Sequence, residues 1–126
     1  MAFNLCAMYS TRPEVTAMNL RISSAGVILA PASAPGATIT HTASSGVYVV
    51  TPIQNFAEFL GAQAQIETST IPGTAAGVLT EACLWTPPSG STRGYLTVTI
   101  FNSASTPAGT DSAFALQMMF SDSRVA

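Results

Sequence analysis

The sequence predicts an all-β protein: an antiparallel β-sandwich or jelly roll of about eight strands, preceded by an extended N-terminal arm. Three observations favour this class. Apolar and polar residues alternate along several short segments, clusters of glycine, proline and serine separate those segments, and no segment has a convincing helical period. We therefore expect an arm at residues 1–16 and one sandwich domain at residues 17–126.

Several of the expected strands, such as 17–23 and 94–102, alternate apolar and polar residues, as half-buried strands do. The segment 55–67 is the most ambiguous, because the spacing of Phe56, Phe59, Leu60 and Gln63 also suits a helix. We interpret it as a short turn at 53–57 followed by a strand at 59–67. In chain order, the expected strands are 17–23, 26–30, 37–43, 46–52, 59–67, 78–86, 94–102 and 112–120.

The connections between these strands are marked by turn-forming residues. The triplet Ser44-Ser45-Gly46 predicts a tight hairpin between 37–43 and 46–52. Two prolines and a glycine make 30–36 a loop, and Pro87-Pro88 makes 86–92 another.

The last two strands have the clearest alternation. Leu96, Val98 and Ile100 share one face of the first, and every second residue from Phe114 to Phe120 is apolar in the other. We predict that they form an antiparallel hairpin with a long loop at 103–111. Their apolar faces are expected to lie buried between the two sheets of the sandwich.

The composition is poor in charge. Among 126 residues the charged fraction is 8 %, against roughly 25 % in ordinary domains, there is no lysine, and the net charge is −2. This balance excludes a nucleic-acid footprint and a patch for anionic membranes. We interpret the scarcity of charge as a sign of surface buried in a homo-oligomer or against other subunits, since interfaces lack charge at their centres. An exterior of Ser, Thr, Ala and Gly is the simpler alternative.

The N-terminal residues lack the basic and apolar regions of a signal peptide, and no apolar run is long enough to span a membrane. Arg12-Pro13-Glu14 interrupts an irregular apolar pattern, so we expect an arm that lays Phe3, Leu5, Tyr9 and Arg12 on a neighbouring subunit. A first strand packed on its own sandwich fits this segment equally well.

No arrangement of residues predicts catalysis, a metal site or a cofactor, so we expect a protein that is not an enzyme. His41 lies within a threonine-rich strand and has no nucleophile motif near it. Glu58, Glu67 and Glu81 lack any sign of the close pairing that glycoside hydrolysis needs. There is no zinc-binding spacing, and the glycines of 73–77 are not followed by the lysine of a phosphate loop. These residues are expected to be structural.

Three further residue types have a local interpretation. The thiols of Cys6 and Cys83 are expected to be free and buried, with a single disulfide as the alternative. Trp85 and Tyr95 flank the loop 86–92 and could stack a sugar ring, as in a carbohydrate-binding module, but the interpretation we favour is that Trp85 plugs one end of the core. Arg93 is a candidate partner for a carboxylate such as Asp111 or Asp122.

Three strand patterns resemble small virion proteins of tailed bacteriophages. They are Gly-Val-Tyr-Val-Val-Thr at 46–51, the strand at 95–103, and Asp-Ser-Ala-Phe-Ala-Leu at 111–116. The resemblance covers roughly residues 37–120, and residues 1–14 match no motif. It implies a β-sandwich subunit of a virus particle, assembled in the host cytoplasm. The expected role is capsid decoration (a cement protein), with a tail or fibre component as the alternative. The implied partners are the major capsid protein or other virion subunits, and a homotrimer is favoured.

Overall fold

The computed structural model describes residues 15–33, 35–54, 56, 58–67, 79–102 and 108–121. Every regular element in this part of the chain is a β-strand, which confirms the all-β prediction. The strands are β1 (Val15–Ile22), β2 (Ile28–Ala30), β3 (Ala37–His41), β4 (Val47–Pro52), β5 (Glu58–Glu67), β6 (Leu79–Thr86), β7 (Tyr95–Asn102) and β8 (Ala113–Ser121).

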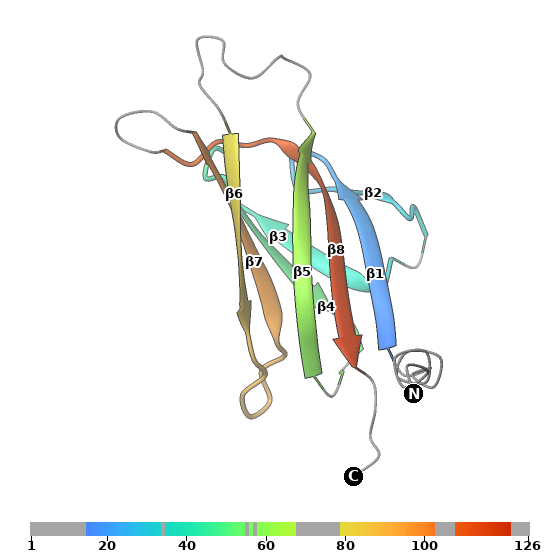
Figure 1. The fold of residues 1–126 in the computed structure, drawn as a ribbon. Helices are drawn as coiled ribbons and strands as arrows, with labels where there is room; N and C mark the ends of the chain where they lie inside the picture. Colours follow the sequence, from blue (N-terminus) through green and yellow to red (C-terminus); the bar gives the residue numbers. More distant parts are fainter. Residues whose placement is uncertain are drawn as a thin grey trace, which may run out of the picture.

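The strands form two four-stranded antiparallel sheets. Sheet A has the order β2-β1-β8-β5 and sheet B the order β3-β4-β7-β6. Figure 1 shows β5, β8 and β1 of sheet A in front of β7, β4 and β3 of sheet B. The predicted β-sandwich is therefore confirmed, and the first and last strands of the described chain, β1 and β8, are neighbours in one sheet.

The predicted hairpin between the last two strands is wrong. β7 pairs with β4 and β6 in sheet B, whereas β8 pairs with β1 and β5 in sheet A. The connection between them crosses from one sheet to the other. β7 and β8 each still bury one apolar face, but the two strands lie in opposite sheets and face each other across the core.

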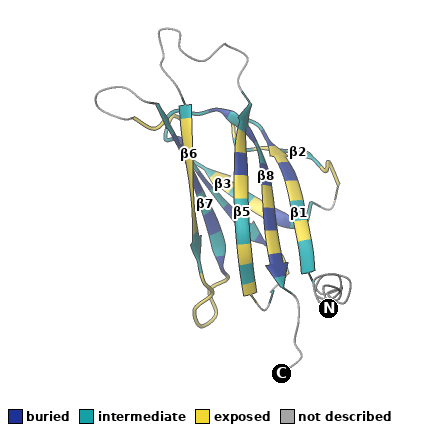
Figure 2. Ribbon diagram, in the orientation of Figure 1, coloured by how far each residue is buried: buried dark blue, intermediate teal, exposed yellow. Residues whose placement is uncertain are grey.

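The core lies between the sheets and is built from alternate residues of each strand. Figure 2 shows buried positions along β8 separated by less buried ones. The expected burial of the Leu96 and Phe114 faces between the sheets is confirmed. The buried core comprises Leu20, Ile22, Ala37, Tyr48, Val50, Ala64, Leu96, Val98, Ile100, Phe114, Leu116, Met118 and Phe120.

The hairpin at Ser44-Ser45-Gly46 is confirmed, and it depends on a glycine. Gly46 has φ = +68°, a left-handed conformation that favours glycine. A Cβ at this position would also lie 2.2 Å from the carbonyl oxygen of Ile100. The turn therefore brings β3 and β4 together while its own backbone packs closely on β7, where the amide of Ile100 donates to the Gly46 carbonyl at 2.7 Å.

Candidate functional site

The outer face of sheet B carries no charged side chain in the four strands that the structure describes. Residues paired directly across strands point to the same face of a sheet, so the buried residues of β4 and β7 define the inner face and their neighbours define the outer one. We call this outer side the uncharged face. It consists of Thr38, Thr40, Val47, Val49, Thr51, Thr80, Ala82, Leu84, Thr86, Tyr95, Thr97, Thr99 and Phe101.

Threonine and valine, which are β-branched, make up most of the uncharged face. Thr40 pairs with Val49, Val49 with Thr97, and Thr97 with Leu84, so one row crosses all four strands. Leu84 ends this row and is 67 % exposed. Because β-branched residues are stiff at χ1, such a face loses little side-chain entropy when another surface covers it.

The uncharged face ends at β6, an edge strand with β7 as its neighbour in the sheet. Exposed edges in natural proteins are usually protected by lysine, proline or a bulge. Neither lysine nor proline occurs in Leu79–Thr86, and its pairing with β7 is regular over the whole length. The one protecting feature in this strand is the charge of Glu81, which pairs with buried Ile100 and so lies on the inner side of the sheet. β6 therefore presents backbone donors and acceptors beside an exposed leucine.

Cys83 lies on β6 and is exposed, whereas the sequence analysis expected a buried thiol. It pairs with buried Val98 and so points toward the interior side of sheet B, but β6 is at the sheet's edge, where coverage is incomplete. Partial burial raises the pKa of the thiol, and the nearby carboxylate of Glu81 raises it further. The thiol is thus held in its unreactive protonated form. Cys6 lies outside the described residues.

His41 is a structural residue with both ring nitrogens occupied, as the sequence analysis expected. Nδ1 is 2.7 Å from the carbonyl oxygen of Val47, and Nε2 is 3.1 Å from Oδ2 of Asp111. Asp111 also accepts hydrogen bonds from the backbone amides of Ser44 at 2.7 Å and Gly46 at 2.9 Å. The carboxylate therefore fixes the β3–β4 turn to the start of β8.

The pKa of Asp111 reflects this network. Burial alone would raise it, but the hydrogen bonds from the two amides and from His41 outweigh burial and hold the pKa below its ordinary value. The His41 ring also stacks on Tyr48, with centroids 4.0 Å apart. The Tyr48 hydroxyl donates to the carbonyl of Ser24 at 2.8 Å, so the network also reaches the β1–β2 turn.

Trp85 and Tyr95 do not form a shared sugar-stacking platform. Trp85 pairs with Leu96, whose side chain is in the core, whereas Tyr95 pairs with Thr86 on the outer side of sheet B. The two rings are therefore on opposite faces of the same sheet. Trp85 pairs with Leu96, the residue after Tyr95. Because successive residues of a strand point to opposite faces, this offset of one residue places the two rings on different faces.

Trp85 instead closes one end of the core, as the favoured interpretation predicts. Its ring stacks on Phe59 at 4.7 Å and meets the edge of Phe120 at 5.6 Å, and Phe56 stacks on Phe120 at 4.4 Å. A cavity of about 310 Å³ opens beside these rings. Because these aromatic rings stack on one another, little of their faces is left for stacking a ligand.

Glu58 and Glu67 do not form a hydrolytic pair with each other, and Glu81 is exposed on β6 in the other sheet. Glu58 and Glu67 are at opposite ends of the ten-residue strand β5, about 30 Å apart at 3.3 Å per residue. Arg21 holds Glu67 in an ion pair. Arg93 donates to the backbone carbonyl of Ile53. No cluster of metal-ligating side chains is found among the described residues.

The predicted interface residues Phe3, Leu5, Tyr9 and Arg12 lie outside the described residues, as do Asp122 and the glycines of 73–77. The part of the chain that the structure describes contains no helix able to cross a bilayer. No protein-family model matches the chain, and no curated protein or solved structure matches it significantly. The function must therefore be argued from the geometry of the sandwich.

Proposed function

We propose that the chain is a structural subunit of a bacteriophage virion, acting as a capsid decoration protein that stabilises the shell by contacts between subunits. The observation that carries this proposal is the uncharged face of sheet B, which continues to the edge strand β6. Its partner is a neutral surface of the shell, because a charged surface would lose its hydration without gaining an ion pair.

The energetics favour such a contact. Burying about 400 Å² of apolar surface at about 25 cal/mol per Å² contributes about 10 kcal/mol before the cost of association is subtracted. Leu84, Tyr95 and Phe101 provide the larger apolar groups of this face. A weak single contact suffices on a shell, because many copies bound side by side gain from avidity when they also contact one another.

The N-terminal arm is the second part of the proposal. Phe3, Leu5 and Tyr9 would clamp across a subunit boundary, and the homotrimer implied by the resemblance would place each arm on a neighbour. β1 begins at Val15, so removing residues 1–14 leaves every described strand intact. The shortened chain should fold and bind capsids poorly, and undiminished binding would exclude the arm.

Sedimentation with purified virion parts tests this function. The protein should pellet with empty capsids in a fixed ratio, and its mass in solution should exceed that of one chain. Pelleting with isolated tails in place of capsids would favour the tail or fibre alternative. A monomeric chain that pellets with neither would exclude a virion role.

A further inference from the structure

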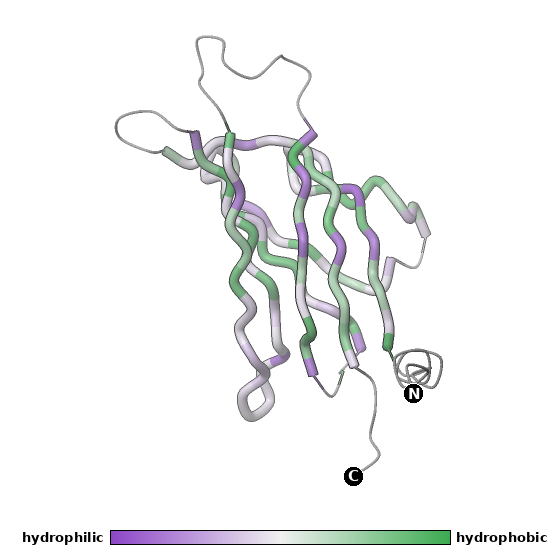
Figure 3. The backbone as a smooth tube through the Cα atoms, in the orientation of Figure 1, coloured by the Kyte–Doolittle hydropathy of each residue, from purple (hydrophilic) through white to green (hydrophobic). Residues whose placement is uncertain are grey.

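Three amide side chains form a row across the outer face of sheet A. Asn19 of β1 pairs with Gln117 of β8, and Gln117 pairs with Gln63 of β5. Residues in register on neighbouring strands share a face, and strands are about 4.8 Å apart, so the row is about 10 Å long. Figure 3 shows hydrophilic segments near one another on β5, β8 and β1. Gln65 lies two residues along β5 on the same face.

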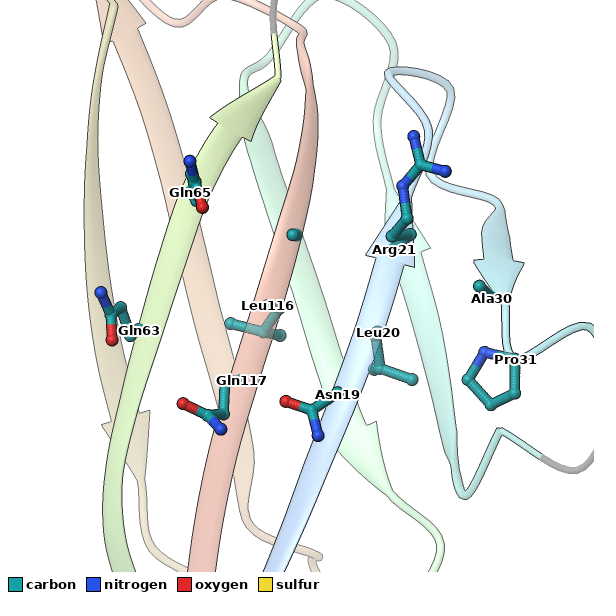
Figure 4. Close-up of a pocket in the computed structure, with 10 residues that line it drawn as sticks. Asn19, Leu20, Arg21, Ala30, Pro31, Gln63, Gln65, Leu116 and Gln117 are labelled. Carbon is teal, nitrogen blue, oxygen red and sulfur yellow. The ribbon is translucent and has the colours of Figure 1, made fainter.

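These four amides have no hydrogen-bond partner among the described residues, although each offers two donors and an acceptor. All four are exposed. They border a hollow of about 570 Å³, a size typical of small-molecule sites. Figure 4 shows Asn19, Gln117, Gln63 and Gln65 projecting from three strands, with Pro31 beside β2 on the far side of Arg21.

The shape of the hollow follows from the sequence of β8. Ala113 and Ala115 are the outward residues of β8 that precede Gln117. Because their side chains are small, the outer surface of sheet A is recessed there. The Arg21–Glu67 ion pair spans β8 over these two alanines, with a nitrogen of Arg21 and an oxygen of Glu67 2.8 Å apart. The pair is neutral overall, so the hollow has polar groups but no net charge.

The chemistry of this site suits a ligand rich in hydroxyl groups. An amide donates and accepts, as a hydroxyl does, and a neutral site does not favour an anion or a cation. A sugar residue lengthens a glycan chain by a distance similar to the strand spacing, so successive residues can meet successive amides. A protein partner fits less well, because the hot spots of protein interfaces are aromatic or arginine anchors, and the row contains neither.

We propose that the outer face of sheet A binds a neutral oligosaccharide, with Asn19, Gln63 and Gln117 as its hydrogen-bonding residues. This inference does not rest on the virion proposal, because it uses the outer face of sheet A, whereas the uncharged face is the outer face of sheet B. A subunit attached through sheet B would carry this site outward, and repeated copies would bind a polysaccharide by avidity.

The test uses the full chain titrated with maltohexaose, cellohexaose and mannohexaose. Nuclear magnetic resonance should show shifts of the Asn19, Gln63 and Gln117 side-chain NH₂ signals on addition of at least one of them. The triple variant Asn19→Ala/Gln63→Ala/Gln117→Ala should bind that sugar at least tenfold more weakly, since each lost hydrogen bond weakens binding several-fold. The matched control Thr42→Ala/Gln54→Ala/Ser91→Ala changes three exposed polar residues that lie outside the hollow and should bind normally.

Three results would overturn the proposal. The first is no binding of any of the three sugars at millimolar concentration. The second is equal binding by the parent chain and the triple variant. The third is a fall in the mass of the particle in solution caused by the triple variant alone, which would make the amide row a contact between copies. Thermal unfolding of each variant checks that the sandwich is intact.

Discussion

Arg21 on β1 and Glu67 on β5 are joined across the intervening strand β8. Nε of Arg21 donates to Oε1 of Glu67 at 3.1 Å, and a terminal guanidinium nitrogen donates to Oε2 at 2.8 Å. The two residues are 46 positions apart in sequence. Their side chains can meet because β8 has only alanines, Ala113 and Ala115, at the outward positions beneath them.

This ion pair sets the pKa values of both groups. The hydrogen bond and charge of Arg21 lower the pKa of Glu67, and Glu67 raises the pKa of Arg21. We predict that Arg21→Gln raises the pKa of Glu67 toward its ordinary range, measured by an NMR titration of the side-chain carboxyl. Arg93→Gln removes a distant arginine and should leave the Glu67 titration unchanged. Since the Arg21–Glu67 pair is exposed, the melting temperature of the Arg21→Gln variant should be no more than a few degrees below that of the parent chain.

Asp111 should stabilise the fold in a pH-dependent way. Its pKa is lower in the folded chain than its ordinary value of 3.8, so its contribution is complete above that value and is lost as the pH falls through the folded pKa. We predict that Asp111→Asn lowers the free energy of unfolding by about 1–3 kcal/mol at pH 7, because backbone amides lose a charged acceptor. In urea titrations the difference in unfolding free energy between the variant and the parent chain should narrow as the pH falls below 3.8. A difference that stays constant would contradict this role.

Gly46 and Gly61 form a matched pair for testing the turn. At Gly46 a Cβ would lie 2.2 Å from a backbone oxygen, and φ is +68°; at Gly61 a Cβ would have no neighbour within 4 Å. We predict that Gly46→Ala lowers the free energy of unfolding by more than about 2 kcal/mol, whereas Gly61→Ala changes it little. Chemical denaturation of both variants measures the loss of unfolding free energy. Similar losses for the two variants would contradict the requirement for a glycine at position 46.

Trp85 and Tyr95 provide a test of the two faces of sheet B. Trp85→Ala should lower the free energy of unfolding by about 2–3 kcal/mol, because it removes a half-buried ring stacked on Phe59. Tyr95→Ala removes a ring from the outer face and should cost less than half as much. Equal losses from the two variants, measured by thermal unfolding, would contradict the assignment of the rings to opposite faces.

The pattern of strands could be predicted from the sequence, but their pairing could not. Alternation shows which residues of β7 and β8 are buried, such as Leu96 and Phe114. It does not distinguish two strands that are neighbours in one sheet from two that face each other across a core, since both arrangements bury the same residues. The long connection between these two strands permits either, and the structure shows the second.

The two candidate surfaces depend even more on register. Asn19, Gln63 and Gln117 occupy polar positions of three separate strands, and nothing in the sequence indicates that they lie in one row. On the other side of the sandwich, the predicted hairpin at 44–46 brings the strands of Thr40 and Val49 together, but nothing in the sequence places Thr97 in the same row. The scarcity of charge predicted a buried surface, but pairing alone shows that sheet B has an uncharged outer face.

The central claim is that the uncharged face of sheet B is the surface by which this subunit attaches to a shell. Co-sedimentation of the double variant Val49→Lys/Thr97→Lys with empty capsids tests it most directly, with Ala25→Lys in the exposed β1–β2 turn as a charge control. If the account is correct, the double variant stays folded and remains in the supernatant, while Ala25→Lys pellets like the parent chain. Pelleting of the double variant at the level of the parent chain would contradict the account.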